Sequence, residues 1–145
     1  MRRILVDSDV ILDLFLDRQP HHDVALHFFS YLEVSRSRFR AFTSPVVIAN
    51  VAYILAKVKS SRFAIDKIAG LRQLLHVATM SESSVDSAVS DPHKDFEDSL
   101  QYYCAIENQI GVVVTRNGSD YPKTAAVVVV APSEFLAMDQ VETGT

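Results

Sequence analysis

The sequence predicts an α/β protein, a three-layer α/β/α sandwich with a mostly parallel central sheet. Short runs of apolar and β-branched residues alternate along the chain with segments of helical periodicity, as in folds built from strand–helix units. Two late runs, 112–115 and 127–130, consist almost entirely of valine, which is typical of strands covered by helices on both faces. With 145 residues, 48% of them apolar, we expect one domain over 1–138 and a polar tail over 139–145.

The first half of the chain is expected to begin with a strand. The run from Arg3 to Val6 ends in Asp7, and a helix follows through Leu16 with Ser8 or Asp9 as its N-cap. Ser44-Pro45 places a capping side chain before a proline at the first helical position, which predicts a further helix. That helix is expected over 45–58. The other expected elements of this half are helices over 22–32 and 61–70 and a strand over 40–43.

The second half predicts one long helix and two buried strands. Asp95 is expected to cap a helix that runs through Ile110 and stops at Gly111, because glycine most readily adopts the left-handed conformation that ends helices. Asp91-Pro92 indicates a turn. The remaining expected elements are a weak strand over 75–80, a short helix over 85–89, strands over 112–115 and 127–130, a last short helix from Ser133 and a frayed tail from Asp139.

Composition excludes several classes of protein. A single cysteine, Cys104, cannot form an internal disulfide, and the five histidines lack partners at zinc-ligand spacing. The apolar run at the N-terminus is too short for a signal peptide, and no stretch of about 18 apolar residues occurs. We therefore expect a cytoplasmic protein with no membrane partner.

Charge is segregated along the chain, although its formal net value is only -4. Between Arg36 and Arg72 lie eight basic residues and one acid, so this stretch carries +7 and the rest carries -11. Such a stretch can face a polyanion such as RNA, or it can simply solvate helix surfaces, which is commoner for a single cluster. The candidate RNA-binding side chains are Arg36, Arg38, Arg40, Lys57, Lys59 and Arg62.

Polar side chains follow the ends of three predicted strands. Asp7 follows the first strand, Thr43-Ser44 end the second, and Thr115, Arg116 and Asn117 end a valine strand with Asp120 just beyond. Ligands of open parallel sheets collect outside the carboxyl ends of the strands, so neighbouring strands would bring these residues to one rim. A desolvated acid such as Asp7 needs hydrogen bonds, a cation or a metal. By contrast, Asp9 is interpreted as a helix cap, and Asp13 as a residue on the solvated face of its helix.

Three further acids open the long helix. Asp95, Glu97 and Asp98 fall in its first turn, where acids also serve as caps and complement the helix dipole by about 0.3–1 kcal/mol each. Capping is the commoner role for such a cluster. Spacing alone leaves open whether this end of the helix reaches the rim. A site that combined Asp7 and Asp98 with another oxygen ligand would suit Mg²⁺ or Mn²⁺.

Three blocks of the sequence resemble PIN domains in order and spacing. They are Val6–Asp13, Asp98–Ala105 and Val114–Tyr121, and the segment 131–136 extends the likeness over nearly the whole chain. The resemblance implies a PIN-like α/β/α fold and a metal-dependent ribonuclease, commonly the toxin of a bacterial toxin–antitoxin pair. Such toxins form homodimers and are inhibited by a small antitoxin. The resemblance also implies that the first turn of the long helix reaches the rim.

The resemblance assigns roles to individual residues. Asp7 matches the first acid of the family and Asp98 the third, while the fourth position falls at Asn117, with Asp120 the next acid. The second acidic position is Asn50, which retains a carbonyl oxygen, and Glu97 or Asp95 would supply the missing charge. Mg²⁺ or Mn²⁺ would be held by Asp7, Asp98, Asp120 and Glu97. Candidates to contact the scissile phosphate are Thr115 and Arg116, with Ser8 a weaker one.

Two other functions are weighed against the nuclease. Asp7-Ser8-Asp9 at a strand end also resembles the motif of haloacid dehalogenase-like phosphatases, but Ile11 stands where a Thr or Val is expected, and no Lys with an acidic pair follows late in the chain. A phospho-receiver domain fits no better. The non-enzymatic alternative is a PIN-like module that binds RNA or protein without cleaving, which Asn50 and Asn117 favour and the remaining acids oppose.

Overall fold

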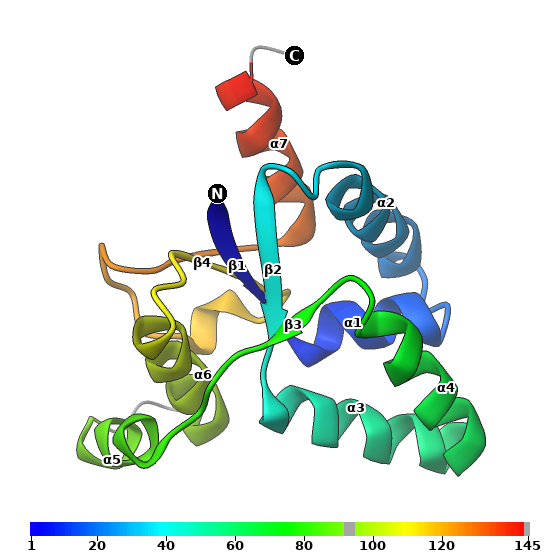
Figure 1. Ribbon diagram of the computed structural model, residues 1–145, viewed down its shortest axis with the longest axis horizontal. Helices are drawn as coiled ribbons and strands as arrows, with labels where there is room; N and C mark the ends of the chain where they lie inside the picture. Colours follow the sequence, from blue (N-terminus) through cyan, green and yellow to red (C-terminus); the bar gives the residue numbers. More distant parts are fainter. Residues whose placement is uncertain (92–94, 144–145) are drawn as a thin grey trace.

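A five-stranded parallel sheet forms the centre of the protein (Figure 1). The computed structural model describes residues 1–91 and 95–143, with side chains described as far as Asp139. The strands lie in the order β3-β2-β1-β4-β5, and every pairing is parallel. Their bounds are β1 Arg2–Val6, β2 Phe39–Thr43, β3 His76–Val77, β4 Val112–Val114 and β5 Val128–Val130. The parallel sheet is therefore confirmed, and β1 lies at its middle.

Helices cover both faces of the sheet. They are α1 Ser8–Phe15, α2 His21–Val34, α3 Pro45–Val58, α4 Ser61–Leu71, α5 Glu82–Ser90, α6 Phe96–Glu107 and α7 Pro132–Thr143, with a 3₁₀ turn, η1, over Gly118–Asp120. Alternate strand residues enter two separate cores because side chains of a strand point to opposite faces. Ile4 and Val6 pack against α1–α4 and α7, whereas Leu5 packs on the other face against α6. The three-layer sandwich is confirmed.

Side-chain caps begin several helices where the sequence predicts them. Ser44 accepts a hydrogen bond from the Val47 N–H at the start of α3, and Asp95 accepts one from the Asp98 N–H at the start of α6. The cap of α1 is different from the expected one, since Asp7 rather than Ser8 or Asp9 occupies it. These caps fix the amino ends of α1, α3 and α6, which all lie near the carboxyl edge of the sheet (Figure 1).

The end of α6 differs from the prediction. The helix ends at Glu107, and Gln109, not Gly111, takes the left-handed conformation with φ 57°. The Ile110 N–H bonds to the Ala105 carbonyl and the Gln109 N–H to the Ile106 carbonyl, which is the double hydrogen bond of a Schellman motif. Ile110 is 2% exposed, so burial of this side chain sets where the helix stops. The predicted turn at Asp91-Pro92 lies partly outside the described residues.

The predicted frayed tail belongs to α7. Asp139 is buried within this helix, where its carboxylate accepts hydrogen bonds from the Tyr31 hydroxyl and, at 3.0 and 3.1 Å, from Arg38 Nη1. Arg2 Nη1 lies 3.8 Å from the same carboxylate. The sequence interpretation was wrong here because a polar residue near a chain end gives no signal of distant basic partners. Within the described residues, no helix has the length and apolarity needed to cross a bilayer.

Replacing Asp139 by Asn tests whether α7 is docked through this carboxylate. Because the change removes the charge that faces Arg38 and Arg2, we expect the free energy of unfolding to fall by about 1–3 kcal/mol. Denaturant unfolding followed by circular dichroism measures the change. Glu33→Gln serves as the control, since this exposed carboxylate lies 3.9 Å from Arg36 and contributes about 0–1 kcal/mol. Equal stability of Asp139→Asn and wild type would contradict the docking role.

Candidate active site

The carboxyl edge of the sheet gathers polar side chains from segments far apart in the sequence. Asp7 follows β1 and Thr115 follows β4, and these two strands are neighbours. Ser44 follows β2, the neighbour on the other side. The predicted rim is therefore present. Its chemistry depends on which acids converge there and on how each one is hydrogen-bonded.

Asp7 is the buried carboxylate at the middle of this edge. It is 7% exposed, and its oxygens accept hydrogen bonds from the Ser8 N–H at 2.7 Å, Thr115 Oγ1 at 3.0 Å and the Tyr121 hydroxyl at 2.9 Å. These donors offset the loss of water around the carboxylate. Burial and the charge of Asp7 raise the pKa of Tyr121 well above its ordinary value, so this phenol remains a donor. Tyr121 carried no sequence signal.

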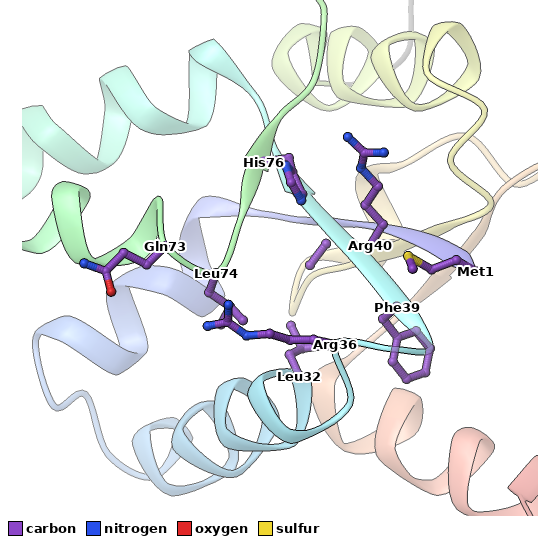
Figure 2. Close-up of a pocket in the computed structure, with 9 residues that line it drawn as sticks. Met1, Leu32, Arg36, Phe39, Arg40, Gln73, Leu74 and His76 are labelled. Carbon is purple, nitrogen blue, oxygen red and sulfur yellow. The ribbon is translucent and has the colours of Figure 1, made fainter.

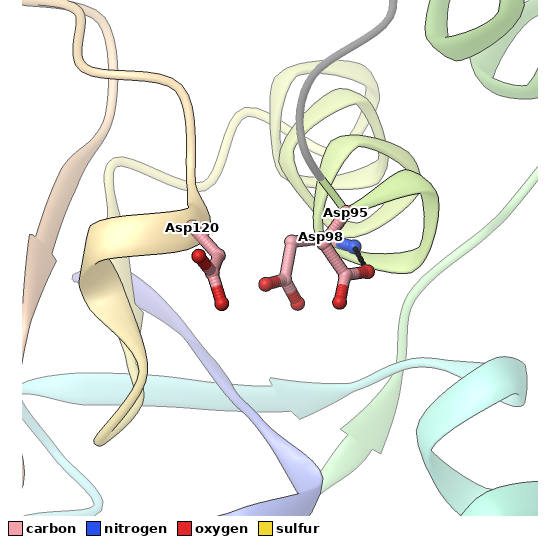
Figure 3. A group of neighbouring side chains, drawn as sticks. All are labelled: Asp95, Asp98 and Asp120. Atoms are coloured by element: carbon pink, nitrogen blue, oxygen red, sulfur yellow. Dashed lines mark hydrogen bonds between the residues drawn. The ribbon is translucent and has the colours of Figure 1, made fainter.

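The first turn of α6 lies at the same edge. Figure 3 shows Asp95 and Asp98 of this turn facing Asp120 of η1. One carboxylate oxygen from each of the three lies within 4.8 Å of those from the other two. Asp95 also caps α6, so it both serves as a cap and takes part in the acidic cluster. The structure thereby settles the question that spacing left open, since the amino end of the helix reaches the rim.

Mutual repulsion shapes the electrostatics of this acidic cluster. The pKa of Asp98 is raised to about 7, first by burial and then by the charges of Asp7, Asp95, Asp120 and Glu97. The pKa of Glu97 is also raised, first by burial and then by the charges of Asp7 and Asp95. The charge of Asp7 thus disfavours the ionisation of both acids. Such unbalanced negative charge is what a bound cation would relieve.

The two asparagines occupy different positions relative to the acids. Asn50, on α3, donates from Nδ2 to Ser8 Oγ at 3.1 Å, which places its amide beside the start of α1. Asn117 is exposed, and its backbone N–H bonds to Thr115 Oγ1. Asp120, three residues further on, is the residue of this segment that reaches Asp98.

The interpretations of Asp9 and Asp13 are wrong. Asp9 is no helix cap, because its Oδ2 accepts the Arg116 N–H at 2.9 Å and Thr115 Oγ1 at 3.3 Å. Burial and the charge of Asp7 raise the pKa of Asp9. Its Oδ1 is buried and has no hydrogen-bond partner among the described residues. Asp13 is 1% exposed and therefore not a solvated helix residue.

The guanidinium of Arg116 is bound to Asp13. Arg116 Nε lies 2.6 Å from Asp13 Oδ2 and Nη2 lies 3.0 Å from Oδ1. The hydrogen bonds that Arg116 makes with its side chain are therefore to α1 and not to the acidic cluster. Thr115, the other candidate for phosphate contact, donates to Asp7 instead.

A buried polar contact joins the two helices that flank the site. Ser44 Oγ donates to Gln101 Oε1 at 2.5 Å, and both residues are fully buried. Gln101 lies one turn after Asp98 on α6, so the contact ties the acidic turn to the start of α3. The other polar atom of this amide, Nε2, is buried and has no hydrogen-bond partner among the described residues. Sequence reasoning missed Gln101 because a single amide in a helix has no distinguishing pattern.

The basic residues between Arg36 and Arg72 do not form one surface. Arg36 and Arg40 line a cavity of about 460 Å³ at the opposite, amino edge of the sheet, together with His76 (Figure 2). Arg38 is bound to Asp139. The remaining candidates, Lys57, Lys59 and Arg62, lie where α3 ends and α4 begins. Lys67 lines one hollow with Arg36 and another with Lys59, so part of the charge cluster is connected in space, whereas Arg38 faces Asp139.

Residues 3–119 match the PIN domain family. Ribonuclease VapC1 from Aquifex aeolicus is 26% identical to the chain over an alignment of 124 residues. The alignment covers 82% of this chain and 84% of that protein. DNA-bound VapBC from Salmonella typhimurium aligns with a TM-score of 0.66 at 13% identity, over 91% of this chain and 99% of the other. The sarcin-ricin-loop-cleaving toxin VapC20 from Mycobacterium tuberculosis aligns with a TM-score of 0.61 at 16% identity, over 76% of this chain and 86% of the other. Since the family match covers well over half of the chain and includes Asp7 and α6 with Asp95 and Asp98, the chain belongs to the PIN domain family.

Proposed function

We propose that the protein is a metal-dependent endoribonuclease that hydrolyses RNA phosphodiester bonds. The observation that carries this proposal is the convergence of Asp95, Asp98 and Asp120 beside the buried Asp7. The likeness to Ribonuclease VapC1 supports RNA as the substrate. Membership of the PIN family leaves the haloacid dehalogenase-like phosphatase without support.

The donor set fits Mg²⁺ or Mn²⁺. All the candidate ligand atoms are oxygens, and most are carboxylate oxygens, which hard divalent ions prefer. Burial and, after it, the negative charges of the neighbouring acids raise the pKa of Asp98 to about 7. We assign Asp7, Asp98 and Asp120 as ligands, with Glu97, Asp95 and the amide oxygen of Asn50 as further donors. A bound ion would neutralise charge that develops on the phosphate and lower the pKa of the attacking water.

The side chains around Asp7 keep the site in place during hydrolysis. The reaction forms a bond from a water oxygen to phosphorus and breaks the bond to the leaving ribose oxygen, which takes up a proton, so no covalent enzyme intermediate is needed. Thr115 and Tyr121 fix the direction of the Asp7 carboxylate. Asn50 holds the Ser8 hydroxyl at the same edge, where Ser8 can contact the phosphate.

We also propose that the protein is a toxin that pairs with a small antitoxin and forms a homodimer. Its structural neighbours include a toxin-antitoxin complex from Klebsiella pneumoniae. A groove of about 410 Å³ between α1, α2 and α4, lined mainly by apolar side chains that include Phe15, Leu26 and Phe29, supports a protein partner. The cytoplasmic location stays a prediction.

A binding module without catalysis is the second candidate. Asn50 and Asn117 favour it, because two of four expected acidic positions lack a negative charge. Calorimetric titration with Mn²⁺ separates the two functions. Heat of binding at millimolar Mn²⁺ supports the nuclease, and no heat supports the module.

Removing single carboxylate charges tests the assignment of the ligands. We expect the wild type to cleave RNA only with Mg²⁺ or Mn²⁺, and Asp7→Asn or Asp98→Asn to lower kcat by about 100-fold or more. Both variants should remain folded by circular dichroism. Asp66→Asn is the control, since Asp66 is exposed and paired with Arg62. Cleavage by Asp7→Asn at the wild-type rate would overturn the proposal.

The hydroxyl of Tyr121 offers a test of the positioning of Asp7. Tyr121→Phe removes one donor from the carboxylate, and loss of a supporting hydrogen bond of this kind lowers metal affinity or activity by about 10–100-fold. Titration with Mn²⁺ and the cleavage rate measure both effects. Tyr102→Phe is the matched control, because its hydroxyl contacts Thr124 and not an acid of the site. Equal losses in the two variants would refute a specific role for Tyr121.

A further inference from the structure

A further cavity opens on the same edge of the sheet as the acids. It has a volume of about 310 Å³ and lies between the start of α2, the β5–α7 junction and the segment after β4. Since a water molecule takes up about 30 Å³ in the liquid, the cavity has room for about ten waters, which is the low end of small-ligand sites. Its lining comprises Asp13, His21, Val24, Ala25, Arg116, Ala131, Pro132 and Ser133.

A buried ionic group forms the polar part of this cavity. Asp13 binds Arg116 at 2.6 and 3.0 Å and also binds Arg18 Nε at 3.0 Å. Two guanidinium groups thus share the Asp13 carboxylate, and the neighbouring Asp9 carboxylate accepts the backbone N–H of Arg116. Arg116 Nη1 has no hydrogen-bond partner within residues 1–91 and 95–139, so one edge of a rigidly held guanidinium can donate to a ligand. The other lining side chains are mainly small and apolar.

The cavity lies beside the segment that holds Asp7. Thr115 donates to the Asp7 carboxylate, and the next residue, Arg116, lines the cavity and donates from its backbone N–H to Asp9. Neighbouring residues of one segment therefore contact the buried carboxylate and the cavity. A single RNA strand with a phosphate at the acids can place a neighbouring nucleotide in the cavity.

We propose that this cavity binds one nucleobase of the RNA, next to the scissile phosphate. The inference rests on the proposed ribonuclease function and assigns Arg116 to base recognition rather than to the phosphate. Val24, Ala131 and Pro132 give the cavity an apolar side against which a planar ring can pack, and the Arg116 guanidinium suits a base edge that carries acceptors. Guanine presents two such acceptors, O6 and N7. Unstacked bases of single-stranded RNA are commonly held by such combinations of packing and hydrogen bonds.

Saturation-transfer NMR with guanosine monophosphate tests the site without any cleavage. We expect the base protons to receive saturation from the wild type, and ribose 5-phosphate, which lacks the base, to receive none. Ser133→Trp fills the cavity from α7 and Val24→Trp fills it from α2, and each should weaken nucleotide binding by about 10-fold or more. Ala137→Trp is the matched control, since Ala137 is exposed on α7 and does not line the cavity.

Three results would overturn the inference: no transfer to guanosine monophosphate, equal transfer to ribose 5-phosphate, or unchanged binding in both cavity-filling variants. Sequencing of cleavage products extends the test to RNA. The wild type should favour one base at a fixed position beside the cleaved bond, and Ser133→Trp should lose that preference while it binds Mn²⁺ as before. Nucleotide binding without RNA cleavage would reject the proposed nuclease function and support the cavity as a nucleobase site. Cleavage without nucleotide binding would keep the nuclease and reject the cavity.

Discussion

The carboxylate of Asp7 is removed from water at the end of the central strand, and much of the surrounding structure compensates for that burial. Thr115, Tyr121 and the Ser8 N–H each donate a hydrogen bond to it. Those donors come from the segment after β4, from the end of η1 and from the start of α1. The parallel order β2-β1-β4 is what allows segments so distant in sequence to converge on one side chain.

Hydrogen bonds alone do not balance the acids beyond Asp7. Asp95, Asp98 and Asp120 approach one another with no basic side chain hydrogen-bonded to Asp98 within the described part of the chain. Folding therefore holds like charges together at a cost in stability, and the raised pKa of Asp98 expresses that cost. Sites of this kind tend to be functional, because a purely structural arrangement gains nothing from such repulsion.

Local patterns were enough to predict the layers and the polar edge that contains Asp7, whereas the resemblance to PIN domains predicted that the acids of α6 reach this edge. Valine runs, the caps at Ser44 and Asp95 and the strand ending at Asp7 depend on neighbours in sequence, and the structure agrees with them. Partners that meet only after folding were not predictable. Asp13 and Arg116 lie 103 residues apart, and nothing near either residue distinguishes a buried pair from two solvated side chains. The Schellman motif at Gln109 escaped prediction for the same reason, since burial of Ile110 decides where α6 ends.

The salt bridge between Arg2 and Asp139 places the start of β1 beside the last turns of α7, at the edge of the sheet remote from the acids. A short flexible linker can therefore join them, and the protein becomes a candidate for circular permutation. New termini opened in a surface loop such as that between α4 and β3 would leave β1, α6 and η1 intact. For the same reason, an affinity tag fused at the N-terminus projects away from the catalytic edge.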